Sequence, residues 1–92
     1  MNDTFAEKAK MWDSNPQVTG LADLFSAELD KIIPDHSGLA ILELGCGTGL
    51  VGLRYAEKAA SLDMVDASPA TLYVLRTKEE ARASHVTVHE GT

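Results

Sequence analysis

The apolar positions of the first third of the chain follow a helical spacing. Between Pro16 and Ile33 they recur at intervals of three and four residues, as along the core-facing stripe of a surface helix: Val18, Leu21, Ala22, Phe25, Leu29, Ile32 and Ile33. Asn15 before Pro16 is a typical helix start, because asparagine caps the first turn and proline fits the first helical position. The pattern predicts a helix that ends at Pro34. A weaker pattern over residues 3–12 predicts a short helix before it.

The rest of the chain alternates between short apolar runs and amphipathic segments. Three runs have the length and composition of strands: residues 39–44, 61–66 and 85–89. The first is almost continuously apolar, which is typical of a strand covered by helices on both faces. Helical patterns lie between the runs, at 50–60 and 68–83, with the charged residues Arg54, Glu57, Lys58, Lys78, Glu79, Glu80 and Arg82 on their solvent side. Strands that alternate with helices predict an α/β fold with a parallel sheet.

A cluster of glycines stands between the first strand and the helix after it, at Gly45-Cys46-Gly47-Thr48-Gly49. Glycine lets the backbone turn sharply and lets a ligand lie against bare main chain, next to the free N–H groups of the following helix. Asp66 ends the second strand, 21 positions after Gly45. An acidic residue about 20 positions on is typical of carboxylates that accept hydrogen bonds from ribose hydroxyls. The pairing predicts a nucleotide site, against the alternative of a structural turn and a solvated aspartate.

The sequence Ile41 to Gly49 resembles the first motif of class I S-adenosylmethionine-dependent methyltransferases, and Met64 to Pro69 resembles the acidic stretch after their second strand. The resemblance runs from about residue 38 to residue 88. Residues 9–16 resemble, more loosely, the segment that precedes this motif in small-molecule methyltransferases.

The resemblance implies that S-adenosylmethionine is the cofactor. It implies that the methionine and ribose portion is cradled by Glu43 and the backbone of Gly45, Cys46, Gly47, Thr48 and Gly49. Asp66 would hold the two ribose hydroxyls, and Ala67 would lie beside the adenine ring. The alternative cofactor, NAD, carries an anionic pyrophosphate that favours a helix N-terminus with little negative charge nearby. A sulfonium and an ammonium instead suit the carboxylate of Glu43, and Leu50 departs from the dinucleotide-binding glycine pattern.

Composition narrows the remaining possibilities. Fourteen acidic and eight basic side chains give a net charge of -6, which disfavours nucleic acid or an anionic membrane as a partner. No apolar run approaches the ~20 residues that cross a bilayer, and the residues after Met1 do not form a signal peptide. Cys46 is the only cysteine, so a cytoplasmic location is expected. The three histidines, His36, His85 and His89, lack a shared metal-ligand spacing, and no metal site is predicted.

The chain is about half as long as a complete domain of the resembled family. We therefore expect residues 1–36 to form an N-terminal helical segment and residues 37–92 to form only the first βαβαβ half of a Rossmann-like domain. No catalytic residue can be assigned. Two functions stay open: a cofactor-binding fragment of a methyltransferase with a small-molecule acceptor, and a non-catalytic binding or self-assembling module. An exposed apolar edge at residues 39–44 predicts a homo-oligomer formed across it.

Overall fold

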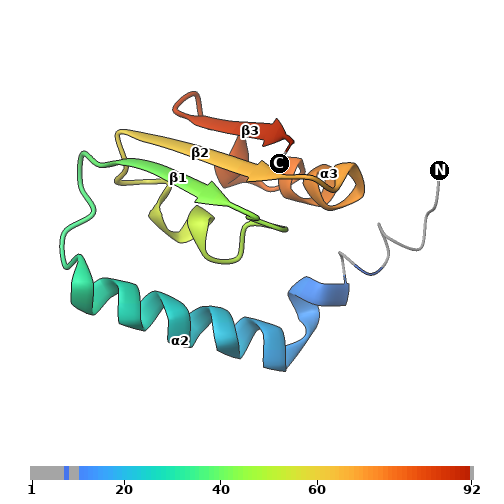
Figure 1. Ribbon diagram of the computed structural model, residues 1–92, viewed down its shortest axis with the longest axis horizontal. Coiled ribbons are helices and arrows are strands. Elements are labelled where there is room, and N and C mark those ends of the chain that lie inside the picture. The colour runs from blue at the N-terminus through green and yellow to red at the C-terminus, as the bar shows by residue number, and fades with distance from the viewer. Residues whose placement is uncertain (1–7, 9–10, 92) are drawn as a thin grey trace.

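The computed structural model describes residue 8 and residues 11–91, and within them three parallel strands form one sheet (Figure 1). The elements follow in the order α2 (Pro16–Ile32), β1 (Ala40–Leu44), the 3-10 helix η1 (Gly52–Tyr55), β2 (Ser61–Asp66), α3 (Pro69–Arg76), the 3-10 helix η2 (Glu79–Arg82) and β3 (Val86–Glu90). The strand order is β1-β2-β3, with Leu44 opposite Val65 and Asp66 opposite Glu90. The α/β fold with a parallel sheet is thus confirmed.

The core lies between β2 and α3. Its fully buried side chains are Leu62, Met64, Leu72 and Leu75. Helix α3 begins as the sequence predicts, because the side chain of Ser68 accepts a hydrogen bond from the N–H of Thr71 at 3.2 Å and Pro69 follows it. This packing fixes α3 against the strand that carries Asp66 at its end.

Within residue 8 and residues 11–91 only one face of β1 is covered, so the prediction of helices on both faces is not met there. Ile41 and Glu43 face the helical side of the sheet, whereas Leu42 and Leu44 are 62% and 72% exposed on the other. Within the described residues the helical segments η1 and α2 lie together below β1 (Figure 1). Strand β1 is also an edge of the sheet, as the sequence analysis expects.

Helix α2 has the predicted bounds to within a residue, and the side chain of Asn15 caps it by accepting from the N–H of Gln17 at 2.9 Å. The prediction that its apolar stripe is buried is wrong for most positions. Ala22 is buried, but Phe25 is 57% exposed. The reason is that an open apolar cavity, which Phe25 lines, separates α2 from β1. Arg54 of η1 holds the helix through a 2.6 Å ion pair with Asp23.

Two helices are shorter than predicted. Between β1 and β2 the described helix is the single 3-10 turn η1, because glycine weakens a helix and Gly52 is packed so tightly that an added Cβ would lie 2.8 Å from Met64 Cε. Helix α3 ends at Arg76 rather than near residue 83, since Lys78 is extended and begins a separate turn. The predicted helix at residues 3–12 falls mostly outside the described residues; residues 8 and 11–14 are helical.

Candidate functional site

The bend after β1 is built on three glycines with left-handed backbone. The φ angles of Gly45, Gly47 and Gly49 are 69°, 58° and 86°, values that side chains with a Cβ rarely adopt. A Cβ added at Gly45 or Gly47 would meet nothing within 4 Å, whereas one at Gly49 would lie 2.6 Å from Leu75 Cδ1. The first two glycines therefore leave the main chain open to a ligand, and the third lets the loop pack on α3.

Asp66 lies directly against this loop. Its Oδ2 accepts a hydrogen bond from the N–H of Gly47 at 2.8 Å, and its Oδ1 accepts one from the N–H of Ser68 at 3.0 Å. The N–H of Cys46 donates to the carbonyl of Val65 at 3.0 Å and extends the pairing of β1 with β2 into the loop. The carboxylate and the glycine bend thus meet at the carboxyl ends of the strands, where ligands of open α/β sheets bind.

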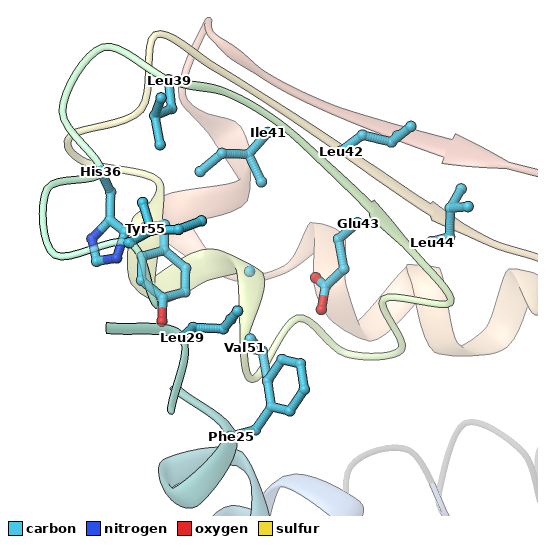
Figure 2. Close-up of a pocket in the computed structure, with 12 residues that line it drawn as sticks. Phe25, Leu29, His36, Leu39, Ile41, Leu42, Glu43, Leu44, Val51 and Tyr55 are labelled. Atoms are coloured by element: carbon cyan, nitrogen blue, oxygen red, sulfur yellow. The ribbon is translucent and has the colours of Figure 1, made fainter. Parts of the chain in front are cut away.

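Glu43 places a second carboxylate beside the loop, on the side of β1 that faces α2. In Figure 2 it points toward Val51 and Phe25, away from the uncovered face of the sheet. Its Oε1 atom is buried and has no hydrogen-bond partner. Burial raises the pKa of Glu43, and a backbone hydrogen bond from the N–H of Gly52 opposes that rise without cancelling it. A carboxylate in such surroundings is suited to a cationic ligand.

Two cavities adjoin Glu43. The first, of about 420 Å³, lies between the N-terminal helices and the loop, and its lining includes Trp12, Glu43, Gly45 and Gly47. The second, of about 370 Å³, is mostly apolar and lies between α2 and β1 (Figure 2). Asp66 does not line the first cavity. It lies half-buried at the end of β2, with the exposed Ala67 after it.

Cys46 and Thr48 have buried side chains, so within the predicted site they contribute main chain rather than reactive groups. Burial raises the pKa of the Cys46 thiol to about 12, with the carboxylates of Glu43 and Asp66 adding to the shift. The thiol therefore stays protonated at neutral pH and is a poor nucleophile. The hydroxyl of Thr48, which is 3% exposed, donates to Asp13 Oδ1.

Sequence reasoning missed Asp13 and Lys78. Lys78 was expected on the solvent side of a helix, but its ammonium donates to the carbonyl of Thr48 at 2.7 Å and pairs with Asp13 Oδ2 at 2.8 Å. That prediction is wrong because α3 ends before Lys78, and the side chain turns toward the loop. No local pattern indicates the contact, since Asp13 and Thr48 are 35 positions apart.

Residue 8 and residues 11–91 contain no group of three or more His, Cys, Asp or Glu side chains that could hold a metal ion. They also contain no helix of the length and hydropathy needed to cross a membrane.

A glycine bend after the first of three parallel strands, with an acidic residue at the end of the second, defines the nucleotide-binding half of a Rossmann-like fold. Residues 41–92 match the family model of a methyltransferase domain. The match covers more than half of the chain, and the protein belongs to this family. The resemblance to class I S-adenosylmethionine-dependent methyltransferases is thereby confirmed. No curated protein sequence matches the chain significantly.

Solved methyltransferases share the fold. Magnesium protoporphyrin IX methyltransferase from Synechocystis PCC 6803, solved with bound S-adenosylmethionine, is 21% identical with a TM-score of 0.64, and the match covers 79% of this chain and 36% of that one. An S-adenosylmethionine-dependent methyltransferase from Mesorhizobium loti is 25% identical with a TM-score of 0.62, covering 72% and 30%. Phosphoethanolamine N-methyltransferase 1 from Haemonchus contortus, in complex with phosphoethanolamine and S-adenosylhomocysteine, is 16% identical with a TM-score of 0.68, covering 100% and 22%. The chain thus spans about a third of these proteins or less.

Proposed function

We propose that this chain is the cofactor-binding part of an S-adenosylmethionine-dependent methyltransferase that acts on a small molecule. In this proposal residues 37–92 form the cofactor-binding domain and residues 1–36 the helical segment that precedes it. The observation that carries the proposal is the side chain of Glu43, which lines the same cavity as a loop whose glycines, Gly45 and Gly47, leave open space for a ligand.

The chemistry of the cofactor fits these groups. S-adenosylmethionine, when bound, supplies a methyl group on a sulfonium, which a nucleophilic acceptor can attack. Its ammonium matches the carboxylate of Glu43, which lines the first cavity, and its ribose hydroxyls match Asp66, whose carboxylate keeps acceptor capacity beyond the two N–H groups of Gly47 and Ser68. The exposed Ala67 leaves room for an adenine ring. The role of this chain is to bind and orient the cofactor, which is the larger part of catalysis by proximity.

The acceptor is inferred from the class of the neighbours. Their names specify a magnesium porphyrin in one case and phosphoethanolamine in another, both small molecules. We propose a small-molecule acceptor for this protein as well. No residue of the chain is proposed as a general base, because no titratable group other than Glu43 lines the first cavity with a buried, unpartnered atom.

Titration with S-adenosylmethionine, followed by calorimetry and by amide NMR, tests the proposal. We expect binding with shifts of the Gly45, Gly47 and Asp66 amides, and loss of binding in Asp66→Ala. Asp63→Ala is the matched control, because Asp63 lies on the same strand but pairs with His89 at 3.0 Å away from the loop. Absence of binding at millimolar ligand, or equal losses in both variants, would contradict the proposal.

The edge of β1 favours a second candidate, a self-assembling module. Leu42 and Leu44 are largely exposed on a strand that, among the described residues, has no neighbouring strand on one side. Exposed apolar edge strands tend to pair with another chain. We propose a homo-oligomer across this edge, and expect Leu42→Lys to dissociate it in sedimentation experiments. A stable monomer of the unmodified chain at high micromolar concentration would exclude it.

A further inference from the structure

Three polar side chains join three separate segments at the glycine loop. Lys78, between α3 and η2, donates to the carbonyl of Thr48 at 2.7 Å and pairs with Asp13 at 2.8 Å. Asp13, in the helical turn at residues 11–14, pairs with Lys78 through Oδ2, and its Oδ1 accepts a hydrogen bond from the hydroxyl of Thr48. We call Asp13, Thr48 and Lys78 the loop clamp. It links the N-terminal segment, the loop and the end of α3 through one buried threonine.

The environment of the loop clamp differs from that of a surface ion pair. The side chains of Lys78 and Asp13 are 25% and 23% exposed, whereas those of the helical pair Lys31–Glu28 are 72% and 68% exposed. Exposed pairs contribute about 0–1 kcal/mol, and partial burial of charge is costly unless further hydrogen bonds compensate it. Here both charged groups also form a hydrogen bond with Thr48, so the pair holds the loop in addition to holding the two side chains together.

The clamp completes the fixing of the loop. Asp66 holds the N–H of Gly47, and the clamp holds the hydroxyl and carbonyl of the next residue, Thr48. The peptide between these two residues belongs to the main chain that lines the 420 Å³ cavity. Loss of the clamp would leave that main chain held by Asp66 and by the hydrogen bond from the N–H of Gly49 to the carbonyl of Cys46.

The clamp also fixes Trp12, which precedes Asp13. Trp12 lines the same cavity as Gly45 and Gly47, is 54% exposed, and is the only tryptophan of the chain. We propose that Asp13 and Lys78 are positioning residues, which hold the Gly47–Thr48 main chain and Trp12 in place for the cofactor. The identity of that ligand rests on the proposed function, whereas the positioning of the loop does not.

Variants of Lys78 in the full chain test the clamp. Lys78→Met removes the charge and both donors, Lys78→Arg keeps them, and Lys31→Met is the control at the exposed pair. In Lys78→Met we expect faster amide exchange at Gly47 to Gly49, stronger quenching of Trp12 fluorescence by acrylamide, and about tenfold weaker S-adenosylmethionine binding, or about 1.4 kcal/mol. Lys78→Arg and Lys31→Met should behave as the unmodified chain does.

The outcomes separate positioning from simple stabilisation. If Lys78→Met only lowers the free energy of unfolding, and native-state exchange, quenching and affinity stay unchanged, the proposal is overturned. If the unmodified chain binds no cofactor, the proposed function fails, and exchange and quenching still decide whether the clamp holds the loop. If the loop loosens but affinity is unchanged, the link to the cofactor is wrong. Should Lys78→Met not fold, Asp13→Ala replaces it, because it removes the acceptor of both Lys78 and Thr48, and amide exchange and quenching equal to those of the unmodified chain overturn the clamp.

Discussion

Replacing Glu43 by glutamine separates the effect of this carboxylate on folding stability from its effect on cofactor binding. The substitution keeps the size and shape of the side chain but removes the charge that burial disfavours. In the ligand-free protein the pKa of Glu43 is raised, so between its ordinary and its raised pKa the folded state binds more protons than the unfolded state. The free energy of unfolding therefore falls as pH rises through that window, and the loss is complete above the raised pKa. Glu43→Gln removes this pH dependence.

The substitution should affect stability and affinity in opposite directions. Without ligand, Glu43→Gln should leave the free energy of unfolding at neutral pH equal to that of the unmodified chain or higher, because Oε1 has no partner to lose. With ligand, the variant loses one hydrogen bond between charged groups, about 1.5–3 kcal/mol. That loss corresponds to about a ten- to hundredfold weaker affinity for S-adenosylmethionine. A residue that only packs against Gly52 would instead lose stability and affinity together.

Calorimetric titrations with S-adenosylmethionine, at pH values from about 5 to about 7, measure the effect on affinity. This pH range lies below the one in which the α-amino group of the ligand titrates. The affinity of the unmodified chain should rise with pH as Glu43 ionises, and that of Glu43→Gln should be flat. Urea unfolding in the same buffers measures the free energy of unfolding of both proteins. Parallel pH profiles for the two proteins, or a stability loss of several kcal/mol in the variant, would refute the assignment of a cationic ligand to Glu43.

Three further substitutions or reagents test the surrounding structure. Gly49→Ala combines a left-handed backbone with a clash at Leu75, and should destabilise the fold by about 2–4 kcal/mol in urea unfolding; a change below 1 kcal/mol would contradict the packing role. Ser68→Ala should cost about 1 kcal/mol because Thr71 N–H loses its cap, and Ser68→Asp should restore it. Cys46, with a raised pKa of about 12, should react with thiol reagents near neutral pH only on unfolding, and rapid labelling of the native chain would argue against its burial.

The elements that the sequence predicted well are those set by local signals. Asn15-Pro16 and Ser68-Pro69 start helices in the structure because capping is a matter of neighbouring residues. The second strand, Ser61 to Asp66, has the predicted bounds. The meeting of Asp66 with the glycine loop was predictable too, because the ends of adjacent parallel strands share one edge.

The failures involve residues whose surroundings are set by distant parts of the chain. The apolar stripe of α2 predicts burial, yet Phe25 is exposed because it lines an open cavity between the helix and β1. Lys78 reads as solvated, yet it binds a loop 30 positions away. Periodicity reports which side of a helix is apolar, but it does not report what that side meets. A second chain or further residues packed on β1 would change the exposure of Leu42 without any change of pattern.

The two carboxylates of the site, Asp66 and Glu43, differ in how their charges affect the stability of the ligand-free protein. Both oxygens of Asp66 accept main-chain N–H groups, so its charge stabilises the loop before any ligand binds. Glu43 has a buried oxygen with no partner, and burial outweighs the hydrogen bond from Gly52, so its charge opposes folding in the ligand-free chain. Asp66→Asn should therefore lower the free energy of unfolding by about 1 kcal/mol, where Glu43→Gln does not. Equal destabilisation of both variants in the absence of ligand would mean that Glu43 has a partner in the folded chain, and its role in binding a cation would lose its physical basis.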